Sequence, residues 1–187
     1  FAENIMQRFQ TLTTETAPTE SRPLLEAVQQ KFGKVPNLLG SLANSPAGLQ
    51  AFLSISGALE SSGLSPAFLE QVAITVAQEN QCQYCLSAHT AIAKMQGVSD
   101  ADILKARSGT ASDAKEAAGL AFALKIVQSR GRVSDEDIAT VRSAGYSDSE
   151  IGAIGTAVVK DIFTNYMNHV MGTPIDWPVV DLEIPVN

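Results

Sequence analysis

Residues 65–89 decide the fold of this chain, and they read SPAFLEQVAITVAQENQCQYCLSAH. Serine followed by proline, at Ser65 and Pro66, is typical of a helix N-terminus, because the serine side chain caps free backbone N–H groups and proline fits the first turn. Apolar side chains then recur at helical spacing as far as Asn80, where we expect this helix to end. A second helical segment is expected over residues 81–96. The stretch therefore predicts a helical hairpin that reverses near Asn80.

Similar helix signals recur along the rest of the chain. Further helices are predicted over residues 23–32, 36–43, 46–63, 113–129 and 147–171, with shorter ones after Ser99 and Ser134. Ser99, Ser134 and Ser147 each precede an acidic residue by three positions, which is typical of a capped helix start. No segment alternates convincingly at the period of a strand. We therefore predict an all-α helical bundle.

The predicted bundle spans residues 23–172, and a segment of different composition flanks it at each end. Residues 1–22 are polar and rich in Thr and Glu, so we expect a poorly ordered arm or a strap that docks on a neighbouring subunit. Residues 173–187 contain three prolines and Trp177, a mixture that favours an extended tail. Such a tail is also suited to packing on a neighbour. These spare segments predict a homo-oligomer.

Two short segments of the sequence resemble each other. Residues 98–103 read VSDADI and residues 133–138 read VSDEDI, and each segment continues to an Arg-Ser pair. Two similar capped helices would explain the resemblance, and so would an internal duplication of a helical unit. Both interpretations stay open at this point.

Composition excludes several classes of function. The chain has 187 residues, a formal net charge of −7 and no stretch that concentrates Lys and Arg, which argues against nucleic acid and anionic membranes as partners. It contains no run of eighteen apolar residues and no signal-peptide pattern, so we expect a cytoplasmic protein. Because the chain begins with Phe1 rather than Met, removal of a leader is an open alternative. Only two cysteines are present, which is not the usage of a secreted disulfide scaffold.

Both cysteines lie in the quoted stretch, beside a histidine. On one helix Cys82, Cys85 and His89 would occupy positions i, i+3 and i+7 of a narrow face. Cys82 would sit in the first turn, where free N–H groups and the helix dipole stabilise a thiolate. His89 could accept the proton of Cys85. If the chain reverses near Asn80, Glu70 lies as far from the turn as His89 does, and its carboxylate comes beside the imidazole.

Other interpretations of these residues compete with thiol chemistry. The cysteines could form half of a zinc site, although only His89 and Glu70 are near enough to complete it. A thioredoxin-like fold is a second alternative, but the sequence lacks the strands that such a fold needs. We interpret His169 as structural or interfacial. We place Tyr84 at the rim of the site, where it could contact a substrate.

The pattern of these residues resembles a known family. Glu70 is followed twelve residues later by Cys-x-Tyr-Cys-x-x-Ala-His, which resembles the alkylhydroperoxidase D branch of the carboxymuconolactone decarboxylase family, in its peroxidase-related subgroup. The upstream segment VPNLL at residues 35–39 also fits. The resemblance implies an all-helical oligomer without a prosthetic group or metal. It also implies that Cys85 attacks, Cys82 is its disulfide partner, His89 is the base and Glu70 works through it.

Together these inferences favour a thiol-dependent hydroperoxide reductase that cycles between dithiol and disulfide. Its partners would be a small hydroperoxide and an external thiol reductant. In the best-known members of the family a histidine occupies the place of Tyr84, a departure that bears on the proton relay and the substrate. The alternative is a non-enzymatic module for redox sensing or disulfide exchange, in which the disulfide alters an interface.

Overall fold

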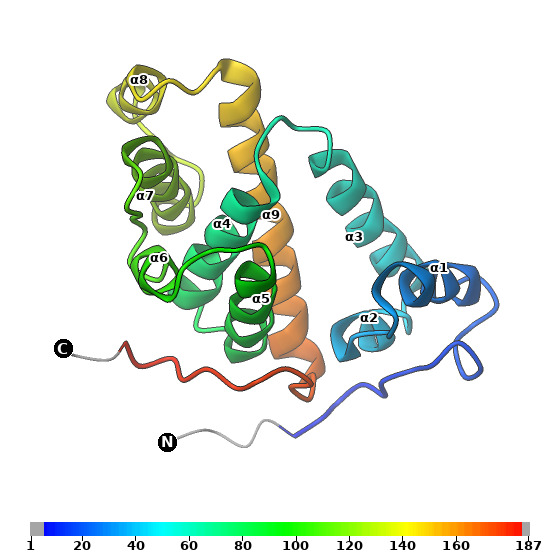
Figure 1. Cartoon of the computed structure of the whole chain (residues 1–187). Coiled ribbons are helices and arrows are strands. Elements are labelled where there is room, and N and C mark those ends of the chain that lie inside the picture. The colour runs from blue at the N-terminus through cyan, green and yellow to red at the C-terminus, as the bar shows by residue number, and fades with distance from the viewer. Residues whose placement is uncertain (1–5, 185–187) are drawn as a thin grey trace.

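The computed structural model describes residues 6–184 of the chain and, within this range, contains nine α-helices and no strand (Figure 1). The helices are α1 (Arg22–Phe32), α2 (Asn37–Leu42), α3 (Pro46–Leu59), α4 (Pro66–Glu79), α5 (Gln83–Met95), α6 (Asp100–Ala106), α7 (Ala114–Ser129), α8 (Asp135–Ser143) and α9 (Asp148–Met171). The predicted all-α fold class is confirmed.

The helices begin where the sequence places capping side chains. The Ser65 hydroxyl accepts a hydrogen bond from the backbone N–H of Phe68 at the start of α4. At the starts of α8 and α9, Ser134 and Ser147 form complete capping boxes with the acidic residues three positions later. These local bonds satisfy backbone donors that a helix start leaves without partners. They explain why the helix starts could be predicted from short patterns.

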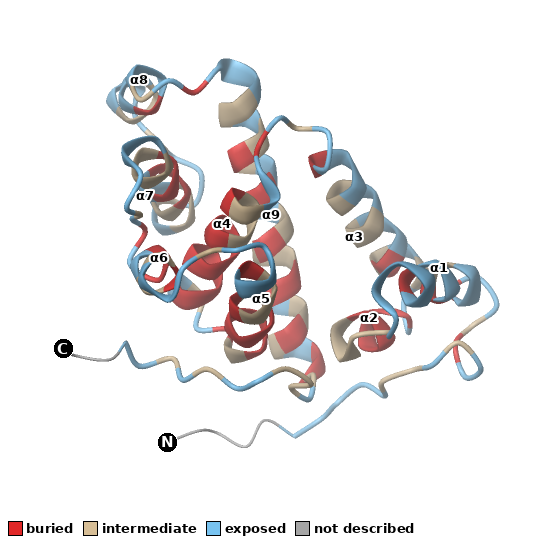
Figure 2. Ribbon diagram, viewed as in Figure 1, coloured by how far each residue is buried: buried red, intermediate tan, exposed pale blue. Residues whose placement is uncertain are grey.

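Helix α4 is the centre of the larger hydrophobic core. Every residue from 71 to 78 is buried, because α5, α6, α7 and α9 all pack against this helix (Figures 1 and 2). A helix enclosed in this way needs apolar side chains all round rather than on one stripe. That requirement explains the run VAITVA at residues 72–77. The hairpin of α4 and α5 thus forms the central part of the larger hydrophobic core.

A second, smaller core joins the N-terminal helices to the end of α9. Leu25 and Val28 of α1, Leu42 of α2 and Leu49 of α3 are buried together with Met171. Helix α9 is long enough to take part in both cores, and it runs through the middle of the molecule (Figure 1). It therefore connects the two halves of the fold.

The N-terminal arm packs on the chain's own helices. The backbone N–H groups of Arg8 and Phe9 donate to the carbonyl of Met171 at 2.9 and 3.1 Å, and Leu12 donates to the carbonyl of Gly40 at 3.1 Å. A Cβ atom at Gly40 would lie only 2.7 Å from the Leu12 carbonyl oxygen, so this approach requires glycine. The expectation of a poorly ordered arm is wrong for residues 6–21. Residues 1–5 of the predicted arm lie outside the described residues.

The C-terminal tail is extended, as predicted, but it also packs on the chain itself. Val180 donates its N–H to the Ser87 hydroxyl of α5 at 3.0 Å. The Arg107 guanidinium donates to the carbonyls of residues 181–183 at 2.7–3.1 Å. Arm and tail therefore do not need a neighbour for docking, and the homo-oligomer stays a prediction without that support. Residues 185–187 lie outside the described range.

The two similar sequence segments form the starts of α6 and α8. Ser99 and Ser134 cap these short helices in the same way, by accepting the backbone N–H of Asp102 and of Asp137. Each short helix precedes a longer one, α7 or α9. Both interpretations, two similar capped helices and an internal duplication, remain compatible with this arrangement. Among residues 6–184, none of the helices combines the length and apolar character needed to cross a membrane.

Candidate functional site

The turn between α4 and α5 positions the first cysteine. Helix α4 ends at Glu79 with Asn80 as its C-cap, and Gln81 then adopts a left-handed conformation with φ 55°. The N–H of Cys82 then donates to the carbonyl of Ala77 at 2.9 Å, and that of Gln81 donates to Gln78 at 3.2 Å. This pair of bonds is a Schellman C-cap, which reverses the chain within a few residues. The predicted hairpin near Asn80 is confirmed.

Cys82 and Cys85 are both free thiols, and both are buried, at 1% and 2% exposure. Cys82 is the N-cap of α5, where its sulfur accepts the backbone N–H of Cys85 at 3.4 Å. The prediction that Cys82 sits in the first helical turn is therefore wrong by one position. Because its sulfur already receives the N–H of Cys85, the cap brings the two residues together at the start of the helix.

Glu70 and His89 meet across the hairpin. The Glu70 Oε2 atom lies 2.7 Å from the Nδ1 atom of His89, with 20% and 17% of the side chains exposed. Burial lowers the pKa of His89, but the Glu70 carboxylate and the Asp161 carboxylate raise it, and the net direction is upward. The predicted approach of Glu70 to His89 is confirmed. The arrangement favours an imidazolium ion beside the thiols.

Helix α9 adds a buried ion pair that the sequence did not indicate. The Asp161 Oδ1 atom lies 3.9 Å from the Nε2 atom of His89 and 2.7 Å from the Nζ atom of Lys160. Only 1% of the Asp161 side chain and 15% of the Lys160 side chain are exposed. Burial lowers the pKa of Lys160, but Asp161 and Glu70 outweigh it and raise the pKa. The histidine is thus held between two carboxylates.

Two buried asparagines of the same helix share one of its faces, and one of them bonds to Cys85. The side-chain amide of Asn168 donates to the Cys85 sulfur at 3.1 Å, and both groups are buried. Asn165 is fully buried, and its Oδ1 atom accepts the side-chain amide of Asn80 at 2.9 Å. Asn80 thereby links the hairpin turn to α9.

The surroundings separate the two thiols in acidity. Burial opposes ionisation of Cys85, but the hydrogen bond from Cys82, the charge of His89 and the Asn168 amide lower the pKa of Cys85 below its usual value. The hydrogen bond to Cys85 and burial raise the pKa of Cys82 well above its usual range. These opposite shifts favour ionisation of Cys85 over that of Cys82.

Tyr84 does not lie at the rim of the site. It is 5% exposed, and its hydroxyl donates to the Oδ1 atom of Asp176 at 2.7 Å and accepts the N–H of Leu38 at 3.1 Å. Burial raises the pKa of this phenol. The rim prediction is wrong because the C-terminal tail covers this face of α5. Tyr84 instead joins the tail, α2 and α5.

Replacing Tyr84 with phenylalanine should therefore lower stability. Tyr84→Phe removes both hydroxyl bonds and leaves the N–H of Leu38 without its partner, at a cost of about 1–3 kcal/mol in the free energy of unfolding. Urea unfolding followed by circular dichroism measures the change. Tyr166→Phe is the matched control, because Tyr166 is 56% exposed. Equal midpoints for the two variants would contradict this role of Tyr84.

His169, interpreted as structural or interfacial, stays outside the cluster. Its backbone carbonyl accepts the guanidinium of Arg8 at 2.7 Å, which helps to hold the N-terminal arm. Within residues 6–184, no three His, Cys, Asp or Glu side chains gather in an arrangement that could hold a metal ion.

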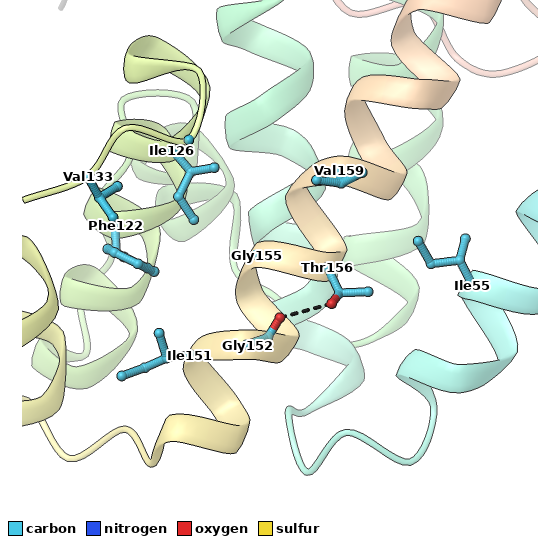
Figure 3. A pocket seen from close by; sticks show the side chains of 10 residues that line it. Ile55, Phe122, Ile126, Val133, Ile151, Gly152, Gly155, Thr156 and Val159 are labelled. Atoms are coloured by element: carbon cyan, nitrogen blue, oxygen red, sulfur yellow. Dashed lines mark hydrogen bonds between the residues drawn. The ribbon is translucent and has the colours of Figure 1, made fainter.

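An apolar groove lies elsewhere on α9 and has a volume of about 520 Å³ (Figure 3). Ile151 and Val159 of α9, Phe122 and Ile126 of α7 and Ile55 of α3 line it. No titratable side chain lines this groove, so it cannot supply thiol chemistry. The candidate site is therefore the cluster between α4, α5 and α9.

Comparison with known proteins agrees with this placement. The model of the carboxymuconolactone decarboxylase family matches residues 46–129, which include Glu70, both cysteines and His89. Residues 46–129 belong to this family. A search of curated proteins found no significant match.

Solved structures of the family type share the fold over most of the chain. An uncharacterized peroxidase-related protein from Ralstonia eutropha JMP134, described as an alkylhydroperoxidase AhpD core, has 26% identity and a TM-score of 0.82, over 91% of this chain and 93% of its own. A peroxidase-related protein from Silicibacter sp. TM1040 has 26% identity and a TM-score of 0.75, over 90% and 92%. These likenesses support the alkylhydroperoxidase D-like branch of the family.

A debrominase solved in complex with 2,3,4-tribromopyrrole is also similar, with 21% identity and a TM-score of 0.69 over 84% of this chain and 86% of its own. At this identity the likeness shows the fold alone. Related folds thus carry more than one activity.

The residues that sequence reasoning missed lie outside the family match. Asp161, Asn165 and Asn168 follow one another at positions i, i+4 and i+7 of α9 and therefore share one face. A polar stripe on a long helix rich in apolar residues was the one available signal. It did not indicate which helix this face would meet.

Proposed function

We propose that this protein is a thiol-dependent hydroperoxide reductase in which Cys85 is the attacking thiol. The observation that carries the proposal is that Cys85 contacts Cys82 and Asn168, while the charge of His89, paired with Glu70 at 2.7 Å, lowers the pKa of Cys85. These contacts favour a thiolate on a buried sulfur, which is the reactive form of cysteine. The peroxidase-related neighbours support the same class of activity.

In the first step the Cys85 thiolate attacks the terminal oxygen of a hydroperoxide. The S–O bond forms as the O–O bond breaks, and the alkoxide leaves and takes a proton from the His89 imidazolium. The products are an alcohol and a sulfenic acid on Cys85. Glu70 and Asp161 stabilise the imidazolium before the step, since both carboxylates raise the pKa of His89.

In the second step the Cys82 sulfur attacks the Cys85 sulfenic acid. The S–S bond forms, the S–O bond breaks, and hydroxide leaves with the Cys82 proton as water. Reduction of the hydroperoxide thus consumes the two electrons of the dithiol. An external dithiol then restores both thiols by exchange with the disulfide.

Access to the thiols favours small substrates. Both sulfurs are almost fully buried, whereas the Glu70 and His89 side chains keep 20% and 17% of their surface exposed. A hydroperoxide would therefore approach from the side of this pair. The rival function is redox sensing, in which the same thiols are oxidised once and no turnover follows.

Sustained peroxide consumption separates the two functions. With dithiothreitol as the reductant and tert-butyl hydroperoxide as the substrate, we expect each subunit to consume many equivalents of peroxide. The reaction without protein, and the protein without dithiothreitol, serve as controls. If consumption stops at one equivalent of peroxide per subunit in the presence of dithiothreitol, the protein is a redox sensor and not a peroxide-reducing enzyme.

A further inference from the structure

Two buried asparagines of α9, Asn165 and Asn168, share the helix face that meets Cys85, and the apolar packing of the core does not explain either of them. Asn168 is 4% exposed and donates to this sulfur at 3.1 Å. A neutral thiol is a weak hydrogen-bond acceptor, so a buried amide gains little from it. A thiolate is a much better acceptor, because hydrogen bonds to charged groups are about twice as strong.

The side-chain amide of Asn165 has a donor that no neighbouring group accepts among residues 6–184. The side chain is fully buried, and its Oδ1 atom accepts the amide of Asn80 at 2.9 Å. This bond fixes the orientation of the Asn165 amide. Its Nδ2 atom has no hydrogen-bond partner among residues 6–184. Asn165 lies three positions before Asn168 and therefore on the helix face that meets the Cys85 sulfur, and its side chain is among the groups that lower the pKa of Cys85.

A buried donor without a partner is costly, by about 1–3 kcal/mol. Asn165 and Asn168 are three positions apart and share one face of α9, so both amides can serve one acceptor. The acceptor that this face offers is the Cys85 sulfur, to which Asn168 already donates at 3.1 Å.

We propose that Asn165 and Asn168 form an amide cradle that stabilises the Cys85 thiolate. The cradle makes these two asparagines part of the reactive site, alongside the Cys82 thiol and His89. It rests on the proposed function only in assigning the reactive thiol to Cys85. Through the thiolate, the cradle also governs how readily the dithiol is oxidised.

Alkylation of Cys85 as a function of pH tests the cradle without any peroxide. In the Cys82→Ser background Cys85 is the single thiol, and its rate of reaction with iodoacetamide follows the thiolate fraction. Asn168→Leu should move the midpoint upward by about one pH unit, the equivalent of one charge-assisted hydrogen bond. Asn165→Leu should move it in the same direction by less. Asn168→Asp should give the largest shift, because a carboxylate repels the thiolate.

Thr164→Val is the matched control. Thr164 is buried on the same helix, and its hydroxyl donates to the backbone carbonyl of Asp161 at 3.0 Å. Its loss should lower the melting temperature while leaving the alkylation midpoint in place. Melting curves for each variant show which ones are folded. If either Asn165→Leu or Asn168→Leu fails to fold, the other variant still tests the cradle.

The outcomes separate the cradle from the proposed function. Midpoints of folded Asn168→Leu and Asn165→Leu within about 0.2 pH units of the Cys82→Ser parent would overturn the cradle, whatever the peroxide assay shows. Absence of peroxide turnover together with shifted midpoints would keep the cradle and remove the reductase.

Discussion

Cys85→Ser should abolish hydroperoxide turnover, whereas Cys82→Ser should keep the first oxidation of Cys85 and lose the cycle. The site favours ionisation of Cys85 and opposes that of Cys82, since the pKa of Cys85 is lowered and that of Cys82 is raised. The loss in Cys85→Ser should be roughly 10³-fold or more, as is typical when a covalent nucleophile is removed. The helix dipole does not reverse this order, because it contributes at most about 2 kcal/mol at a buried site and acts on both cysteines at the start of α5.

A brief peroxide pulse followed by mass spectrometry measures this difference. Cys82→Ser should show a sulfenic acid that a dimedone probe traps at Cys85, at one equivalent per subunit. Cys85→Ser should show little reaction in the same time. Serine at either position conserves the size of the side chain, so melting curves should verify that both variants are folded. Sulfenic acid that appears faster on Cys82 would falsify the assignment and exchange the roles of the two thiols.

Lys160→Met should destabilise the protein by about 3 kcal/mol or more, the usual effect of breaking a buried ion pair. Among residues 6–184, the substitution leaves the Asp161 carboxylate, which is 1% exposed, with His89 at 3.9 Å as its remaining cationic partner. Burial raises the pKa of Asp161 even with Lys160 in place, which shows how unfavourable an uncompensated charge is there. Urea unfolding near neutral pH measures the loss of free energy of unfolding.

A double-variant cycle tests whether the pair or the single lysine is responsible. Lys160→Met combined with Asp161→Leu removes both charges, and we expect it to recover a large part of the loss. Arg142→Ala is the control, because the ion pair of Arg142 with Asp148 is exposed and its removal should change the midpoint little. A double variant that is no more stable than Lys160→Met alone would show that packing, not charge, explains the effect.

Cys85 and the Lys160–Asp161 ion pair belong to different layers of one site. Cys85 takes part in the proposed reaction directly. Asp161 raises the pKa of His89 whereas Lys160 lowers it, and the opposite charge of the Cys85 thiolate raises the pKa of Lys160. Lys160→Met should therefore also slow the oxidation of Cys85 in the folded protein, because the thiolate loses a nearby cation.

The sequence alone determined the helices, the hairpin and the meeting of Glu70 with His89. Helix starts depend on bonds between residues about three positions apart, as at Ser65 and Ser147, and such bonds leave a readable pattern. Predicting the contact across the hairpin required one more inference, the position of the turn. Glu70 and His89 lie 19 positions apart, and a turn near Asn80 is enough to bring them together.

The tertiary structure decided everything that α9 and the tail contribute. Asn168 is 83 positions from Cys85, and Asp176 is 92 positions from Tyr84. No local signal records which helix a polar stripe will face or which side chain a tail will cover. Contacts of this kind follow from the packing of whole helices around α4, which depends on the complete core. For that reason the sequence could indicate the reactive residues of α4 and α5, whereas only the folded chain shows the amides and the ion pair around them.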